Sequence, residues 1–281
     1  MLDQNSPARP LTLIHFTDTH IAADQPFLNI DSYSKLRNAI AAVQAMETRP
    51  DAVIISGDLT HNGNEAAYIR FKELVDEIEN TFHVPVLMAM GNHDFRVPFR
   101  SIVLGIADSD ENAPYYYSQM IGDVRVIVLD SKVPGKEIGF IDPEQLAWLA
   151  KELATQVAGG NIVVLHHPPL PNPIMPQDHV LSNAAELGAI LRGQPIHAIL
   201  CGHIHFHSIG LFNGILCAAG TGVAFTLDPS ATQGLRMLNG SGFNLIAIRD
   251  GVLTANTIEM PGEQTLMYYY KPAEQAALET H

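Results

Sequence analysis

Short apolar runs alternate with helix-period segments over residues 11–90, and this order constrains the fold more than any other feature. The runs are 11–16, 52–55 and 84–90. In the intervening segments, 31–48 and 64–82, apolar residues recur three or four positions apart, as on one face of a helix. Alternating strands and helices favour parallel strands with helices packed outside them. The sequence therefore predicts an α/β fold.

Strand patterns dominate the rest of the chain. Residues 115–121 and 124–129 are separated by Gly122-Asp123, which predicts a hairpin, and Asp142-Pro143-Glu144 is typical of a helix start. Further strands are predicted at 162–165, 198–200, 209–212, 215–218, 244–248 and 253–258. Because no repeat or linker separates these elements, we expect one domain over 1–260. Residues 261–281 are interpreted as a tail or a dimer arm, and the long segment 220–242 as a lid, an interface or a disordered loop.

Composition excludes several functions. A formal charge of −14 with only 16 Lys and Arg argues against binding to long nucleic acids. No apolar run is long enough to span a membrane, and the first residues lack the basic and apolar regions of a secretory signal. With only two cysteines, Cys201 and Cys217, a disulfide framework is not expected, so we expect a cytoplasmic protein. An anionic substrate would need a local source of positive charge, and 13 histidines point to bound metal.

Polar clusters recur at the C-terminal ends of the predicted strands, where open α/β sheets bind ligands. They are Asp18-x-His20, Gly57-Asp58, Gly91-Asn92-His93-Asp94, His166-His167 and Gly202-His203-x-His205. Each cluster alone is compatible with a turn, a loop cap or a solvated histidine, but their joint recurrence at strand ends is not expected by chance. Carboxylate, amide oxygen and imidazole are metal ligands. Seven such groups exceed the needs of one tetrahedral metal, which favours two metals sharing a carboxylate.

These clusters, in this order and spacing over 11–207, resemble the signature of the calcineurin-like metallophosphoesterases. Segments 129–135, 146–149 and 166–169 are also similar to the bacterial class III 3′,5′-cyclic-nucleotide phosphodiesterases, although relatives that act on glycerophosphodiesters share much of this pattern. The resemblance implies an α/β fold in which two mixed sheets form a β-sandwich flanked by helices, within a single domain.

The resemblance also implies roles for individual residues. One metal would be bound by Asp18, His20 and His205, the other by Asn92, His166 and His203, with Asp58 bridging the two. Iron, manganese or zinc ions, divalent or of mixed valence, are the implied cofactors. The residues implied in catalysis are Asp58, Asn92 and His93. Those implied in substrate binding are His20, Asn92, His93 and His207.

Some roles stay open at this stage. His167 is interpreted as a support for the ligands or as structural, and Asp94 as orienting His93 or holding its loop. His207 either lines the substrate site or is merely solvated. Ordinary structural or surface roles are expected for the remaining histidines, which are His15, His61, His83, His179, His197 and His281.

The implied reaction is hydrolysis of a small-molecule phosphodiester. A hydroxide bridging the metals would convert a 3′,5′-cyclic nucleotide, such as cyclic AMP, to its 5′-monophosphate. The alternative is a glycerophosphodiesterase or a broad-specificity phosphodiesterase. A non-catalytic binding or scaffold relative is disfavoured because all seven ligand positions are filled. Segment 168–176, with five prolines, is expected to form a wall of the site. Met267 and Tyr268-Tyr269-Tyr270 predict an apolar interface, and hence a homodimer.

Overall fold

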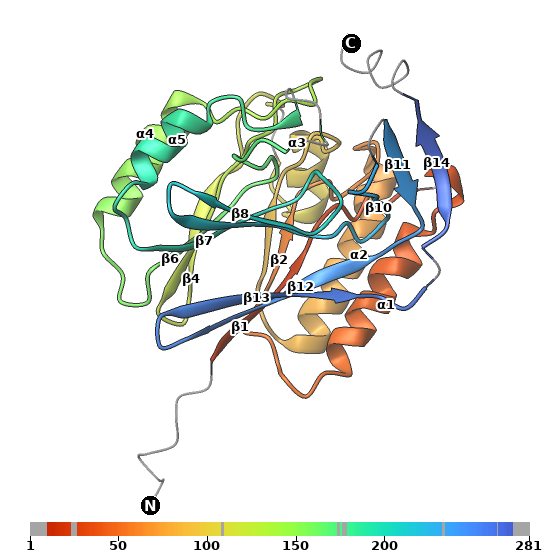
Figure 1. Ribbon diagram of the computed structural model, residues 1–281, viewed down its shortest axis with the longest axis horizontal. Helices are drawn as coiled ribbons and strands as arrows, with labels where there is room; N and C mark the ends of the chain where they lie inside the picture. The colour runs from red at the N-terminus through yellow and green to blue at the C-terminus, as the bar shows by residue number, and fades with distance from the viewer. Residues whose placement is uncertain are drawn as a thin grey trace, which may run out of the picture.

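The computed structural model describes residues 10–23, 27–107, 110–172, 175, 179–231, 234–262 and 264–271. Two mixed β-sheets pack face to face, and helices cover the outer face of each (Figure 1). The expected β-sandwich of two mixed sheets flanked by helices is therefore confirmed.

The first sheet has the strand order β13-β12-β1-β2-β3. These strands are β1 (Leu11–Phe16), β2 (Ala52–Ser56), β3 (Val86–Ala89), β12 (Gly242–Arg249) and β13 (Val252–Glu259). Strands β1, β2 and β3 are parallel, and β12 pairs antiparallel with β1. The helices α1 (Ser32–Gln44) and α2 (Glu65–Phe82) connect the parallel strands. The predicted alternation of strand and helix is confirmed here.

The second sheet has the strand order β4-β5-β6-β7-β9-β8. Its strands are β4 (Tyr117–Ile121), β5 (Val124–Val128), β6 (Asn161–Val164), β7 (Ile196–Cys201), β8 (Ser208–Phe212) and β9 (Ile215–Ala219). Strands β5, β6, β7 and β9 are parallel, whereas β4 and β8 are antiparallel edge strands. Helices α4 (Pro143–Ala154) and α5 (Ala184–Leu191) pack on its outer face. The pattern of α5 was not assigned from the sequence.

Smaller elements complete the described chain. A single helical turn at Phe27–Asn29 precedes α1, and α3 (Arg96–Pro98) continues into a wider helical turn at Phe99–Val103. A three-stranded sheet joins β10 (Thr226–Leu227), β11 (Leu235–Leu238) and β14 (Leu266–Tyr270). The long segment 220–242 thus contributes two short strands, and the start of the expected tail pairs with β11 of its own chain.

Polar residues fix where the long helices begin. Asp31 Oδ1 accepts a hydrogen bond from the backbone of Ser34 at 3.0 Å, and Asn64 Oδ1 accepts one from Ala67 at 2.8 Å. Asp142 Oδ1 accepts one from Gln145 at 2.8 Å. Each side chain satisfies a backbone N–H that has no partner within its helix. These caps orient the helices as they leave the strand-end loops.

The core has three layers. Leu13, Ile54 and Val126 belong to the layer between the two sheets. Ile14 and Phe16 point the other way, into the layer beneath α1 and α2, because side chains alternate along a strand. A third layer lies between the second sheet and α4 and α5. Burial on both faces explains why the parallel strands read as continuous apolar runs.

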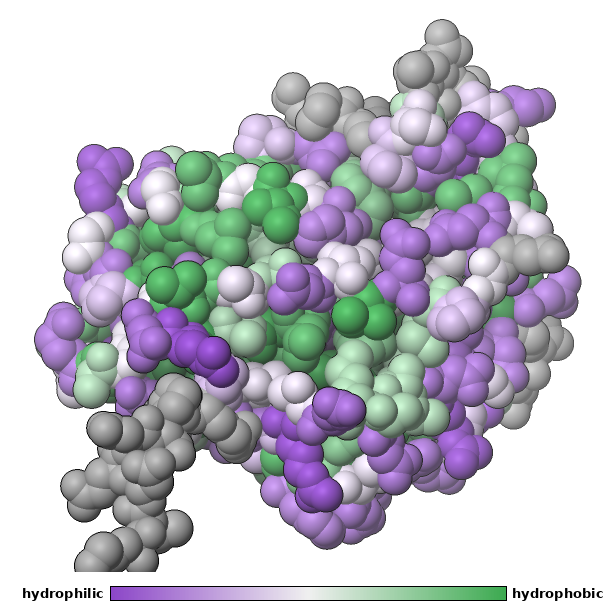
Figure 2. All heavy atoms as spheres, turned by 60° about the horizontal axis from the view of Figure 1, so that its bottom comes forward, coloured by the Kyte–Doolittle hydropathy of each residue, from purple (hydrophilic) through white to green (hydrophobic). Residues whose placement is uncertain are grey.

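Two edge strands expose apolar side chains. Ile209 and Leu211 on β8 and Val252 on β13 are more than half exposed. Figure 2 shows hydrophobic residues gathered on one part of the face brought forward, with hydrophilic residues around them. Within the described residues, no helix has both the length and the apolar character needed to cross a membrane.

Candidate metal centre

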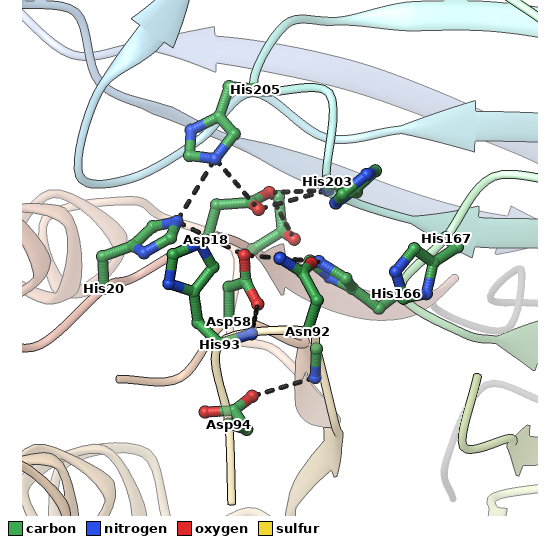
Figure 3. Close-up of polar contacts among 12 residues, drawn as sticks. Asp18, His20, Asp58, Asn92, His93, Asp94, His166, His167, His203 and His205 are labelled. Carbon is green, nitrogen blue, oxygen red and sulfur yellow. Dashed lines mark hydrogen bonds and ion pairs between the residues drawn. The ribbon is translucent and has the colours of Figure 1, made fainter. Parts of the chain in front are cut away.

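The sequence clusters converge at one edge of the β-sandwich. Each follows a parallel strand at its C-terminal end, three from the first sheet and two from the second. Figure 3 shows the predicted ligands facing a common centre. These residues are Asp18, His20, Asp58, Asn92, His166, His203 and His205. The structure therefore brings the whole predicted set together.

Asp58 lies between the two predicted groups of ligands. Its Oδ2 atom is 3.4 Å from His20 Nε2 on one side and 3.4 Å from His166 Nε2 on the other. Its Oδ1 atom accepts a hydrogen bond from the backbone N–H of His93 at 2.9 Å. One carboxylate oxygen thus faces donors of both groups, the arrangement that a bridging ligand requires.

The first group consists of Asp18, His20, Asp58 and His205, whose donor atoms lie within 4.8 Å of one another. His205 Nε2 is 3.3 Å from Asp18 Oδ1 and 3.2 Å from His20 Nε2. All four side chains are buried. Two carboxylates and two imidazoles at this spacing match the ligands of a divalent transition metal.

The second group contains Asn92, His166 and His203. Asn92 Oδ1 lies 3.1 Å from His166 Nε2. His203 Nε2 is buried and has no hydrogen-bond partner among the residues that the structure describes. Buried polar atoms are normally satisfied, so an imidazole nitrogen without a partner, grouped with other histidine nitrogens, fits a bound cation. The residues present therefore fit a second metal as well as a first.

Hydrogen bonds on the far side of two rings fix which nitrogen faces the centre. His166 Nδ1 donates to the backbone oxygen of Ser56 at 2.8 Å, and His205 Nδ1 donates to that of Phe225 at 3.1 Å. Backbone carbonyls only accept, so these bonds place a proton on each Nδ1 and direct Nε2 toward the centre. Metal-binding histidines generally have such a partner.

Burial and charge set the protonation of the site. Burial, the largest influence, lowers the pKa of His20 and His203 well below the ordinary value, which keeps both rings neutral. Burial alone would raise the pKa of Asp58, but the positive charge of His166 lowers it well below its usual range. Burial likewise acts to lower the pKa of His166, and Asp58 outweighs it and raises that pKa to about 9.

Five of the predicted ligands have left-handed backbone conformations. Their φ angles are 52° at Asp18, 42° at His20, 49° at Asp58, 71° at His203 and 55° at His205. Residues other than glycine rarely adopt this region, and each such residue costs on the order of 1–3 kcal/mol. Strain at so many positions in one cluster is typical of a functional site.

Neighbouring glycines leave room for the ligands. A Cβ atom on Gly91 would lie 2.2 Å from Asp58 Oδ1, and one on Gly57 would lie 2.5 Å from His166 Nδ1. Gly91 does not adopt a left-handed φ, so its own backbone conformation does not require glycine. The carboxylate of Asp58 occupies the space of its missing side chain, so close approach rather than backbone conformation requires glycine there.

His93 lies against the first group without joining it. Its ring centroid is 4.7 Å from that of His20, and its Nδ1 donates to the backbone oxygen of His61 at 2.6 Å. Burial acts to lower the pKa of His93, but Asp58 and the His61 carbonyl outweigh it, and the net pKa is raised. Because Nδ1 donates to a carbonyl, only Nε2 could meet a substrate, and the predicted contact of His93 with substrate stays a prediction.

Asp94 supports the loops and does not orient the ring of His93. Its carboxylate accepts hydrogen bonds from the backbone N–H groups of Leu59 at 3.1 Å, Thr60 at 3.1 Å and Gly91 at 2.9 Å. Tyr68 donates a further bond at 3.1 Å. Figure 3 shows Asp94 apart from the centre and joined to it through the loop. Of the two roles considered, the geometry favours loop support.

The two remaining histidines of open role differ in position. His167 Nδ1 is 2.8 Å from Ser131 Oγ, and its ring centroid is 4.6 Å from that of His203. This placement fits a support for the second group. His207 is exposed and its Nδ1 lies 2.6 Å from Thr257 Oγ1 on β13, so its predicted contact with substrate stays a prediction.

Sequence reasoning missed several residues beside the centre, among them His61 and Glu137. His61 was expected to be ordinary, yet its Nδ1 is 3.4 Å from His20 Nδ1 and its ring stacks on His93. Its position three residues after Asp58 was the available signal. Glu137 Oε2 accepts a hydrogen bond from Asn92 Nδ2 at 2.7 Å. It lies on a loop far from any strand end, and no sequence pattern indicated it. Of the predicted wall 168–176, residues 173, 174 and 176 lie outside the described residues.

Comparison with known proteins found a matching family model and several similar proteins. The family model described as calcineurin-like phosphoesterase matches residues 11–207. A cAMP/cGMP dual specificity phosphodiesterase of Mycobacterium tuberculosis is 34% identical over 273 residues, covering 95% of this chain and 85% of the relative. A probable glycerophosphodiester phosphodiesterase of Arcobacter nitrofigilis is 32% identical over 213 residues, covering 73% of this chain and 76% of the relative. A dimetal phosphatase from Danio rerio has a similar fold, with a TM-score of 0.60 and 17% identity over 90% of this chain and 100% of that one.

Proposed function

This chain belongs to the calcineurin-like phosphoesterase family, a family of hydrolases, and we propose that it is a two-metal phosphodiesterase of 3′,5′-cyclic nucleotides. The observation that carries the proposal is the position of Asp58 Oδ2, 3.4 Å from a histidine of each ligand group. The similarity to the mycobacterial cyclic-nucleotide enzyme, which spans 95% of this chain, supports the substrate class.

The seven clustered residues supply the metal ligands in this proposal. Asp18, His20 and His205 hold one cation, Asn92, His166 and His203 hold the other, and Asp58 contacts both. Divalent cations bound there supply Lewis acidity to the phosphoryl oxygens and lower the pKa of a nucleophilic water. This local positive charge offsets the net charge of −14, which would otherwise repel an anionic substrate. Iron, manganese and zinc all suit a site of carboxylate, amide and imidazole ligands.

His93 is the proposed general acid. Its Nδ1–H is held by the His61 carbonyl at 2.6 Å, so the proton available for transfer is the one on Nε2. The raised pKa of His93 favours the doubly protonated ring that such a transfer needs. Opening a 3′,5′-cyclic phosphate expels the O3′ oxygen of the ribose. Protonation of that oxygen by His93 would leave the 5′-monophosphate as product.

The second candidate is hydrolysis of a linear diester such as glycerophosphocholine, which the 32% identity to a probable glycerophosphodiester phosphodiesterase favours. That similarity covers less of this chain, 73% against 95%. A scaffold role without catalysis is disfavoured because every ligand is present and its donor atom faces the centre.

Turnover of three substrates by the Mn²⁺-loaded protein tests the proposal. Cyclic AMP, glycerophosphocholine and bis(p-nitrophenyl) phosphate should all be compared by kcat/KM. We expect cyclic AMP to exceed glycerophosphocholine and to give only 5′-AMP. A higher kcat/KM for glycerophosphocholine would assign the enzyme to linear diesters. Absence of turnover with all three substrates would reject the enzymatic proposal itself.

A further inference from the structure

We propose that Glu137 is a positioning residue that sets the orientation of the Asn92 amide, and with it the affinity of the second metal site. This inference rests on the proposed function only in taking Asn92 as a metal ligand. Glu137 lies in the loop between β5 and α4, and it was not among the residues indicated by the sequence.

The two ends of the Asn92 amide have different partners. Its Nδ2 donates to Glu137 Oε2 at 2.7 Å, a short distance for an N–H···O bond. Its Oδ1 lies 3.1 Å from His166 Nε2, within the second group of ligands. The amide therefore spans the gap between the loop and the candidate metal site.

An asparagine side chain has two nearly isosteric orientations, and only one of them can bind a cation. The amide oxygen is a metal ligand, whereas the NH₂ group has no lone pair to offer. A carboxylate accepts hydrogen bonds and cannot donate them, so Glu137 stabilises the orientation in which NH₂ faces the loop. Its bond is charge-assisted, and such bonds are about twice as strong as neutral ones.

The backbone of Asn92 is held by the same loop. Lys132 Nζ donates to the backbone oxygen of Asn92 at 3.0 Å. Arg96 in turn donates to the backbone oxygen of Lys132 at 2.8 Å and to Asp130 Oδ2 at 2.7 Å. Those contacts are largely buried, whereas Glu137 is exposed. The position of the Asn92 backbone is therefore fixed independently of Glu137, whose side chain accepts its hydrogen bond from the amide.

The exposure of Glu137 makes it suitable for substitution, because its side chain does not contribute to the core. Mn²⁺ binding to metal-free Glu137→Ala, measured by calorimetry, should show one of the two sites weakened by roughly 10–100-fold, the usual effect of losing a residue that orients a ligand. The other site should keep its affinity. Glu144→Ala, which removes an exposed carboxylate from the start of α4, should match the wild type at both sites.

Measurements in a second variant, Asn92→Asp, distinguish an effect of Glu137 on the orientation of residue 92 from an effect of its charge. In Asn92→Asp both carboxylate oxygens can bind a metal, so no orientation has to be selected and Glu137 would repel the new side chain. Adding Glu137→Ala to this background should leave the Mn²⁺ affinity unchanged or increase it. An equal loss in both backgrounds would show that Glu137 acts only through its charge and would overturn the proposal, as would an unchanged isotherm for Glu137→Ala alone.

These measurements need no substrate, so their outcome is independent of the substrate panel. Wild-type protein that binds two Mn²⁺ ions but hydrolyses no cyclic nucleotide would contradict the proposed function. The Mn²⁺ isotherms would still decide the role of Glu137. As a kinetic readout, Glu137→Ala should lose activity at limiting Mn²⁺ and recover it at high Mn²⁺. Failure to recover would contradict a role in metal affinity.

Discussion

At the scale of single residues, two side chains of the site have polar atoms with different partners. Asp58 offers Oδ2 to both ligand groups while Oδ1 holds the backbone of His93. His93 Nδ1 is held by a backbone carbonyl, which leaves Nε2 for the proposed role toward substrate. In each case one atom is fixed by the fold, so the other is presented without the entropy cost of ordering it at the moment of reaction.

Asp58→Ala should be the most damaging loss of a single ligand. Because Oδ2 faces both groups, its removal should leave well under two metals per chain by elemental analysis, together with negligible diesterase activity. Asn92→Ala should weaken mainly one site and be partly rescued by added Mn²⁺. Asp76→Ala removes an exposed carboxylate on α2 and serves as the control. Full metal content in Asp58→Ala would contradict the bridging role.

His93→Ala should discriminate between leaving groups. A cyclic nucleotide expels a poorly stabilised alkoxide, so its hydrolysis should fall by roughly 10²–10⁴-fold without the general acid. Bis(p-nitrophenyl) phosphate expels a stable phenolate and should lose far less. His83→Gln, at the exposed C-terminal end of α2, is the control. Equal losses on both substrates would assign His93 to electrostatic stabilisation of the phosphate, and loss of a metal would make it a ligand.

At the scale of elements, the strands position the predicted ligands, and the glycines let these side chains approach one another. Each ligand cluster begins within a few residues of a strand end, and strand pairing fixes the spacing of those ends. The loops then bring side chains closer than strands alone allow. Gly57 and Gly91 make this possible because a neighbouring ligand occupies the volume of a Cβ.

Gly91→Ala tests this close approach. The new Cβ would lie 2.2 Å from both the backbone nitrogen and Oδ1 of Asp58, so the loop after β3 or Asp58 itself must move. We expect loss of metal and a lowered melting temperature. Gly262→Ala should change neither, because within the described part of the chain, its sequence neighbours aside, no atom lies within 4 Å of the added Cβ. Normal metal content in Gly91→Ala, measured by elemental analysis, would mean that the loop yields freely.

At the scale of the whole molecule, the two stacked sheets bury polar as well as apolar groups. His15 on β1 is fully buried, with its Nε2 2.8 Å from Ser56 Oγ, and burial lowers its pKa from 6.5 to about 3. Between these values the unfolded chain binds a proton that the folded chain does not. Stability therefore rises with pH in this window, is complete above 6.5, and is lost as the pH falls toward 3.

His15→Gln removes this titration and keeps a hydrogen-bonding group near Ser56. In metal-free protein, the slope of unfolding free energy against pH between about 4 and 6 should decrease by about one proton, roughly 1.4 kcal/mol per pH unit. Denaturant titrations at several pH values measure the slope, which is unaffected by a constant loss of stability. Parallel slopes for His15→Gln and wild type would refute the assignment.

The expected homodimer through the C-terminal segment stays a prediction. The described part of that segment pairs with β11, and Met267 packs against the core, while Leu266, Tyr268 and Tyr269 are exposed. A chain ending at Pro261 should be a monomer by light scattering if this segment is the interface, whereas a chain ending at Tyr270 should remain a dimer. A dimer in both truncations would place the interface elsewhere, and the exposed edge strand β8 would be the next surface to test.

The sequence by itself determined most of the order of strands and helices, apart from α5 and the short strands β10, β11 and β14, and it identified the residues that cluster. Both are local signals: apolar periodicity identifies an element, and a polar group directly after a buried strand must lie at its end. The α/β class and the candidate set from Asp18 to His205 followed from these signals and from the family resemblance that they carry.

Only the tertiary structure decided how distant segments meet. The contact of His20 with His205 joins residues 185 positions apart, and the insertion of β12 beside β1 joins the end of the chain to its beginning. Glu137 reaches Asn92 from a loop without any regular pattern, and Gly91 is required by Asp58 rather than by its own turn. Such contacts depend on the packing of two sheets against each other, which fixes distances in space that no local pattern encodes.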